Sequence, residues 1–137
     1  MKKKIEKKLK TSWLFATLDD AVLKQLILYM SDKKMPRGEV LAMQGKPANE
    51  FIFVESGAFD NFIRIQGAQN DKPLKTLGPN DIYGEMALLY ISTRTSNLRA
   101  KADSTVWLLD RDIYQTVLKD AAIKHRQSML TFLNNAS

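Results

Sequence analysis

Short segments rich in apolar, β-branched and aromatic residues follow one another between residues 39 and 109, and this spacing constrains the fold most. Turn-forming groups separate them, among them Gly45-Lys46-Pro47, Ser56-Gly57 and Gly78-Pro79-Asn80-Asp81. Short strands at such regular intervals predict an antiparallel β-roll, or jelly-roll barrel. The expected strands span residues 39–43, 51–55, 59–65, 73–77, 97–102 and 105–109.

Helical patterns precede and follow these strands. Asp19 is of a type that often caps a helix N-terminus, and the apolar residues behind it recur at the spacing of one helix face. We therefore expect a helix at about residues 19–30, ended by the turn sequence Met35-Pro36-Arg37-Gly38. Asp110 is expected to cap a final helical region. The predicted fold class is α+β, an antiparallel β-roll flanked by N-terminal and C-terminal helices.

The length and composition are those of one globular domain. The chain has 137 residues and a mass of 15.6 kDa, enough for a single core. The absence of cysteine excludes disulfides and thiolate metal sites. There is no run of about 18 apolar residues and no apolar stretch typical of a signal peptide. We expect a cytoplasmic protein without an integral membrane segment, although lysines directly after Met1 also fit a piece of a longer protein.

The N-terminus is strongly basic and supplies much of the net charge of +6. Ile5 and Leu9 give a cationic helix one narrow apolar stripe. Such a helix could bind nucleic acid or an anionic membrane, or it could lead into the domain and pack its stripe there. We favour the second interpretation, because no aromatic residue lies among the lysines for stacking on nucleic acid. The lysines of this basic segment are Lys2, Lys3, Lys4, Lys7, Lys8 and Lys10. After it, Trp13, Leu14 and Phe15 are expected to act as apolar anchors.

The most informative functional pattern is Tyr83-Gly84-Glu85-Met86-Ala87-Leu88-Leu89, with Arg94-Thr95-Ser96 after it. Gly84 allows a sharp bend and close approach of a ligand, and a short helical turn after it would offer N–H groups to a phosphate. Arg94 carries a fork of donors that matches phosphate oxygens. Glu85 would repel phosphate but can accept from sugar hydroxyls. The pattern predicts a ribose phosphate site, where Thr95 adds a hydroxyl.

A plainer interpretation of the same residues is also available. A Gly-Glu pair followed by an arginine nine positions after the acid is a common pattern. Glu85 and Arg94 could simply form an ion pair at the surface. The spacing alone does not separate these two interpretations.

Residues 83–96 closely resemble the phosphate-binding cassette of the eukaryotic cyclic-nucleotide-binding domain. Gly45, Gly57 and Gly78 match its turn glycines, and Val106-Trp107-Leu108-Leu109-Asp110-Arg111 is similar to its last strand and helix start. The likeness covers about residues 13–118. It implies a β-roll with a short cassette helix, in which Glu85 binds the ribose 2′-hydroxyl and Arg94 binds the cyclic phosphate of cGMP or cAMP. It also implies backbone contacts from Gly84, Met86, Ala87 and Ser96.

Within this family, the chain is most similar to the first cGMP site of cGMP-dependent protein kinases. Thr93-Arg94-Thr95, residues 110–116 and residues 123–133 carry this likeness. The regulatory subunit of cAMP-dependent kinase usually has alanine where Thr95 stands, and a threonine hydroxyl can reach the 2-amino group of a guanine. The resemblance therefore implies cGMP as the preferred ligand, with cAMP as the alternative and no cofactor.

Four positions depart from the family pattern. Tyr83 replaces a phenylalanine and adds a hydroxyl that needs a partner, and Thr93 replaces a proline. Ala48 stands at a frequent glycine position, and Asn97 follows Ser96 where threonine or serine is usual. None of these changes removes a phosphate ligand, so we expect the pocket to be functional.

The resemblance also implies a regulatory role. It divides the chain into a basic N-terminal helix (1–12), a nucleotide-binding domain (13–118) and a C-terminal switch helix (119–137). Tyr114 is expected to repack when ligand binds and to move that helix, which would control a kinase catalytic domain in cis or in trans. Tyr114 could instead be an ordinary core residue. Tyr90 and Phe132 are candidates to cover the base.

Other classes of function have little support in the sequence. His125 is the single histidine, whereas metal-dependent jelly-roll enzymes need several converging ligands. No nucleophile elbow, Gly-rich nucleotide loop or His-Arg-Asp motif occurs, so we expect no catalytic residue and no metal. About 25 residues follow the last strand and the start of the next helix, too few for a helix-turn-helix module, so we expect no nucleic-acid partner.

Two alternatives to a nucleotide-binding regulatory domain remain: a binding-dead interaction module, and a basic anion-binding or membrane-associated domain.

Overall fold

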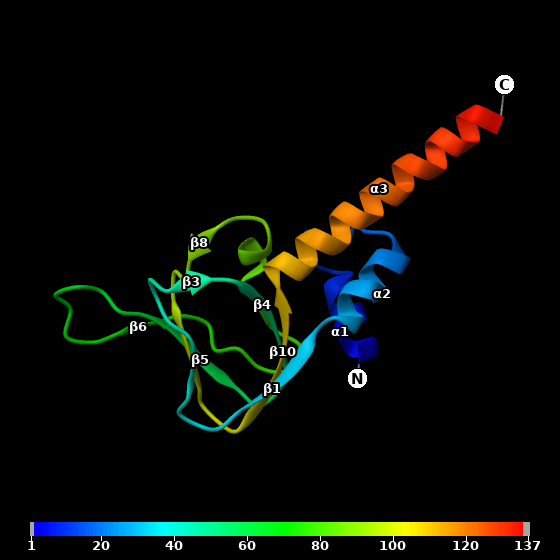
Figure 1. Ribbon diagram of the computed structural model, residues 1–137. Coiled ribbons are helices and arrows are strands. Elements are labelled where there is room, and N and C mark those ends of the chain that lie inside the picture. Colours follow the sequence, from blue (N-terminus) through cyan, green and yellow to red (C-terminus); the bar gives the residue numbers. More distant parts are fainter. Residues whose placement is uncertain (1, 136–137) are drawn as a thin grey trace.

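A computed structural model describes residues 2–135. Ten strands and a 3-10 helix, η1 (Glu85–Leu88), lie between an N-terminal pair of helices and one long C-terminal helix (Figure 1). The helices are α1 (Lys2–Leu9), α2 (Asp20–Leu28) and α3 (Arg111–Asn135). The strands are β1 (Ser31–Met35), β2 (Val40–Ala42), β3 (Pro47–Ala48), β4 (Glu50–Ser56), β5 (Phe59–Ile63), β6 (Lys72–Pro73), β7 (Ile82–Tyr83), β8 (Ser92–Thr93), β9 (Asn97–Ala100) and β10 (Ser104–Asp110).

The strands form an antiparallel roll, as predicted. One sheet has the order β1-β10-β4-β7, a second has the order β2-β9-β5-β6, and β3 pairs with β8. Strand β4 is buried on both faces: Ile52 and Val54 belong to the core of the roll, while Phe51 and Phe53 belong to the core under the helices. A strand covered on both sides shows a continuous apolar run instead of alternation, which explains Phe51-Ile52-Phe53-Val54.

The N-terminal helix packs on the domain. Ile5 and Leu9 are both 0% exposed and join a core with Phe15, Phe51 and Phe53. This confirms that the apolar stripe of the basic segment packs on the domain. Lys10, the residue after α1, forms ion pairs with Glu6 (3.2 Å) and Asp20 (3.7 Å). These carboxylates raise the pKa of the Lys10 ammonium.

Several predicted boundaries were wrong. Helix α2 ends at Leu28, and residues 31–35 form β1, which pairs with β10 instead of continuing into a turn. The sequence pattern did not predict this strand, because Ser31-Asp32-Lys33-Lys34 is polar. Polar residues are usual in a strand that lies exposed at a sheet edge. Asp19 occupies the N-cap position of α2 without a side-chain capping bond. Of the strand expected at 73–77, Lys72–Pro73 forms β6, while Leu77 makes an isolated bridge to Phe59.

Helix α3 begins where the sequence predicts. The Asp110 carboxylate accepts hydrogen bonds from the backbone N–H groups of Asp112 (2.8 Å) and Ile113 (3.3 Å), as a capping residue does. The helix then runs without interruption to Asn135, through the predicted boundary at residue 118, and its C-terminal half extends away from the roll (Figure 1). The division of function at that boundary stays a prediction.

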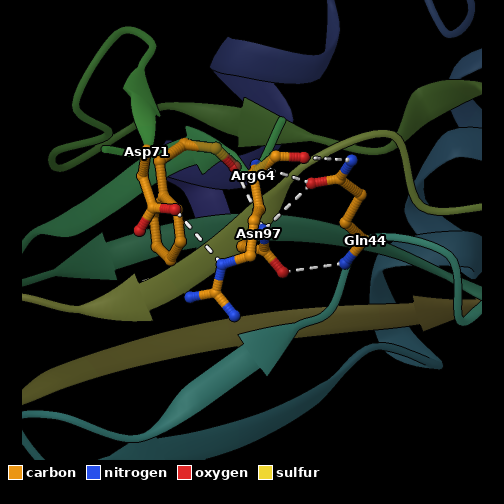
Figure 2. Close-up of polar contacts among 5 residues, drawn as sticks. Gln44, Arg64, Asp71 and Asn97 are labelled. Atoms are coloured by element: carbon orange, nitrogen blue, oxygen red, sulfur yellow. Dashed lines mark hydrogen bonds and ion pairs between the residues drawn. The ribbon is translucent and has the colours of Figure 1, made fainter. Parts of the chain in front are cut away.

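A polar cluster fastens the loop before β3 to strands β5 and β9 (Figure 2). The side-chain amide of Gln44 accepts from the Arg64 N–H (2.9 Å) and donates to the Arg64 carbonyl (3.2 Å). The Gln44 N–H donates to Asn97 Oδ1 (2.9 Å), and Arg64 Nε pairs with Asp71 at 3.2 Å. Asn97 directly follows the cassette, so this cluster holds the strand that leaves it.

Candidate functional site

A cavity of about 360 Å³ lies beside η1 and brings together most of the predicted site residues. Its walls come from η1, from the segment around Arg94, from the end of β3 and from the chain before α2. The lining residues are Trp13, Ala48, Tyr83, Gly84, Glu85, Met86, Ala87, Ser92, Thr93, Arg94 and Thr95. Of the residues predicted to contact the sugar, the phosphate or the base, apart from the two candidates for covering the base, Ser96 is the one outside this lining.

Gly84 is required by the geometry of the cavity. It starts η1 with a φ of 84°, in the left-handed region that favours glycine. A Cβ at this position would lie 2.5 Å from Nη1 of Arg94 and 3.1 Å from the Glu50 carbonyl oxygen. Any side chain here would therefore displace the Arg94 guanidinium.

Arg94 is held from several sides. It is 8% exposed; its Nη2 donates to the Glu50 carbonyl at 2.8 Å, and the guanidinium carbon lies 5.3 Å from the centre of the Tyr83 ring. Its backbone N–H donates to Lys46, and its carbonyl accepts from Gly45, both at 2.8 Å. Burial lowers the pKa of the Arg94 guanidinium because it disfavours the charged form, while Tyr83 and Glu50 oppose this shift.

No ion pair within residues 2–135 involves Arg94. A buried guanidinium is costly unless an anion compensates its charge. Glu85 does not play that part: its Oε2 accepts a hydrogen bond from the Ser12 hydroxyl. The structure therefore does not support the interpretation of Glu85 and Arg94 as a simple ion pair. It places on the same cavity an acid and an arginine that has no carboxylate of residues 2–135 within ion-pair distance.

Tyr83, which lines the cavity, is hydrogen-bonded to the buried Ser96. The Tyr83 hydroxyl lies 2.9 Å from Ser96 Oγ and 3.3 Å from the Ser96 carbonyl, so the hydroxyl that this chain adds to the family pattern has a partner. Ser96 is 3% exposed. Its predicted backbone contact to a ligand stays a prediction. Thr95 lines the cavity and is exposed.

Tyr114 lies away from the cavity, in the core under α3. It is 3% exposed, and its ring meets that of Phe15 edge-on with centroids 6.1 Å apart. The same burial raises the pKa of its phenol. This is the position of a core residue, and a switching role for Tyr114 stays a prediction.

Two residues missed by sequence reasoning connect α3 to the cassette. Gln115 Nε2 donates to the Leu88 carbonyl at the end of η1 (3.2 Å), and Arg111 Nη1 donates to the Tyr90 carbonyl (3.2 Å). Arg111 also reaches the Ala48 carbonyl at 3.3 Å. Their spacing of four puts both on one helix face, and both lie within the residues 110–116 that carry the family resemblance.

The N-terminal segment also contributes to the site, which was not predicted. Ser12 bonds Glu85, and Trp13 lines the cavity while 62% exposed. Trp13 was interpreted as an apolar anchor, and this was wrong for it, although Leu14 and Phe15 are buried. Tyr90 and Phe132, the aromatic candidates for covering a base, do not line the cavity.

Comparison with known proteins agrees with this geometry. Residues 32–121 match the model of the cyclic nucleotide-binding domain. The chain belongs to this family. Among curated members, it is 31% identical over 130 residues to a cAMP-dependent protein kinase regulatory subunit of Blastocladiella emersonii, covering 95% of this chain and 32% of that protein. It is 27% identical over 136 residues to mouse cGMP-dependent protein kinase 2, covering 99% of this chain and 17% of that protein.

A solved structure of the same family confirms the β-roll. The regulatory domain of Toxoplasma gondii PKA, crystallised with cAMP, superposes with a TM-score of 0.75 at 33% identity, covering 96% of this chain and 50% of that one. This chain spans about a third of the length of the Blastocladiella emersonii regulatory subunit. The particular likeness to the first cGMP site of cGMP-dependent kinases stays a prediction.

Two kinds of site are absent from residues 2–135. No group of three or more histidine, cysteine, aspartate or glutamate side chains is placed to hold a metal ion. Within the same residues, no helix carries an apolar stretch of the length that a membrane span requires.

Proposed function

We propose that this chain is a regulatory module that binds a cyclic nucleotide in the cavity beside η1. Arg94 binds the cyclic phosphate, and Glu85 accepts from the ribose 2′-hydroxyl. The observation that carries this proposal is the buried Arg94, which has no carboxylate of residues 2–135 within ion-pair distance and lines one cavity with Glu85. A phosphate supplies the missing anion, and charge-assisted bonds to it are among the strong ones.

Backbone groups of Gly84, Met86, Ala87 and Ser96 complete the proposed site. Gly84, Met86 and Ala87 line the cavity. The Ala87 N–H already donates to the Gly84 carbonyl at 3.0 Å, so a phosphate contact there must share this hydrogen or follow a rearrangement of η1. η1 is a 3-10 helix of four residues, and the hydrogen bonds of such helices have poorer geometry than those of an α-helix.

The base is read, in this proposal, by Thr95. Its place in the cavity lining supports a preference for cGMP, because its hydroxyl can accept from the 2-amino group that guanine has and adenine lacks. The alternative is cAMP, which is supported by the similarity to cAMP-dependent regulatory subunits. We propose cGMP as the preferred ligand.

Occupancy is passed on through α3 to a kinase catalytic domain, in cis or in trans, in the cytoplasm. The bonds of Gln115 to Leu88 and of Arg111 to Tyr90 support this step, because they join α3 directly to the last residue of η1 and to the segment that follows it. A ligand that draws η1 toward Arg94 would pull on the first turns of α3. The free energy available equals the difference in ligand affinity between the two arrangements.

Calorimetric titration with cGMP and with cAMP tests the proposal. We expect saturable binding to the wild-type chain and tighter binding of cGMP, with Thr95→Ala reducing cGMP affinity while leaving cAMP affinity unchanged. Tighter cAMP binding would instead support the alternative ligand. If neither nucleotide binds, the chain is an interaction module that keeps the roll without a ligand, and the proposed function is wrong.

A further inference from the structure

Trp13 is an exposed aromatic side chain carried by an anchored stretch of backbone. Its indole is 62% exposed, whereas Ser12 and Leu14 on either side are 6% and 8% exposed. The Ser12 carbonyl accepts from the N–H groups of Phe15 (3.2 Å) and Ala16 (2.9 Å), and Phe15 is fully buried. The backbone at Trp13 is therefore anchored by its neighbours. The indole itself keeps a large exposed apolar surface and takes part in the lining of the cavity.

The position of Trp13 relative to Glu85 is set by Ser12. The Ser12 hydroxyl donates to Glu85 Oε2, which leaves the other carboxylate oxygen to accept from a ligand. Trp13 is the next residue and also lines the cavity, so the segment that carries the indole is joined to Glu85 through Ser12. Tyr83, the other aromatic residue in the lining, is committed to Arg94 and to Ser96.

The covalent structure of a nucleotide links this end of the cavity to the base. The ribose 2′-carbon is bonded to the 1′-carbon, which carries the base. A nucleotide whose 2′-hydroxyl meets Glu85 and whose phosphate meets Arg94 therefore presents its base beside the Glu85 end. An aromatic face is the general partner of a purine, since every base has a π-face on which it can stack.

We propose that Trp13 forms one wall of the base site and packs its indole on the purine of the bound cyclic nucleotide. The inference rests on the proposed function and adds a ligand-contacting residue outside the cassette. Ser12 acts as a positioning residue, because it joins the segment of Trp13 to the sugar-binding acid.

Tryptophan fluorescence tests the contact directly, because the chain has two tryptophans. Trp107 lies in β10, where its Nε1 donates to Glu55 at 3.3 Å, and it does not line the cavity. In Trp107→Phe the emission comes from Trp13, and we expect it to change saturably with cGMP and cAMP at the midpoint found by calorimetry. In the matched variant Trp13→Phe, the remaining emission should stay constant while calorimetry still reports binding.

Affinity provides a second readout. Trp13→Ala should weaken binding by about five- to a hundred-fold, as base stacking predicts, whereas Trp13→Phe should retain most of it. The side chain is exposed, so both variants should melt at the wild-type temperature. Wild-type affinity of Trp13→Ala, or constant emission from Trp107→Phe during calorimetric binding, would overturn this inference and leave the proposed function intact. No calorimetric binding by the wild-type chain would overturn both.

Discussion

The two ends of the candidate cavity differ in how firmly they are built. At the arginine end, the Arg94 guanidinium is buried, bonded to Glu50, stacked near Tyr83 and closed in by the glycine at position 84. At the glutamate end, Met86 is 50% exposed and Trp13 is 62% exposed, and the carboxylate is held by one hydroxyl from a distant segment. A preformed end provides affinity at little cost in ordering, whereas an open end can adapt to the ligand.

This difference predicts that the polar contacts at the arginine end supply more binding free energy than those at the glutamate end. Loss of a polar group at the arginine end should therefore reduce affinity more than loss of one at the glutamate end. The following substitutions test that order, from the largest expected effect to the smallest.

Arg94→Ala should abolish most binding of cGMP and cAMP. Charge-assisted hydrogen bonds contribute about 1.5 to 3 kcal/mol, so we expect a loss of about ten- to a hundred-fold or more by calorimetry. Arg94→Lys should also bind more weakly, because a point charge cannot replace the guanidinium fork. Wild-type affinity in both variants would show that the cavity is not the nucleotide site.

Gly84→Ala should damage both folding and binding. A left-handed backbone costs about 1 to 2 kcal/mol for a residue with a Cβ, and the added methyl group would meet Arg94 Nη1 at 2.5 Å. We expect a lower melting temperature together with weakened binding. The matched control is Gly67→Ala, at a position with a similar φ of 84° where no atom lies within 4 Å of the added Cβ. Its stability loss should be similar or smaller, without loss of binding.

Glu85→Gln should weaken binding by about ten-fold, less than Arg94→Ala, since it replaces a charge-assisted bond to the ribose with a neutral one. The difference should vanish for a 2′-deoxy cyclic nucleotide, which lacks the hydroxyl. An equal loss for the ribose and deoxyribose ligands would place Glu85 outside the sugar site.

Ser12→Ala should have the smallest effect of the four. Loss of one hydrogen bond to a partly exposed carboxylate should reduce affinity by about two- to five-fold, at the lower range of such bonds. Ser12→Thr should restore it, because the hydroxyl is retained. An effect as large as that of Arg94→Ala would contradict the proposed difference between the two ends.

Sequence patterns were most reliable where the cause is local. The β-roll follows from short apolar segments between turn residues, and the cap of α3 follows from Asp110 at its start. The grouping of Gly84, Glu85, Arg94 and Thr95 in one cavity could also be expected, because these residues lie within a dozen positions of one another. Each of these features depends on residues that are neighbours in the chain.

Features that depend on distant segments required the folded structure. Ser12 reaches Glu85 across 73 positions, and Arg94 reaches the Glu50 carbonyl across 44. Residues 31–34 carry no apolar pattern and form a strand because β10 offers them an unpaired edge. No local propensity encodes such partners. Tertiary packing brings these partners together. It also places Trp13 in the lining of the cavity, although the apolar sequence around Trp13 predicted a buried residue.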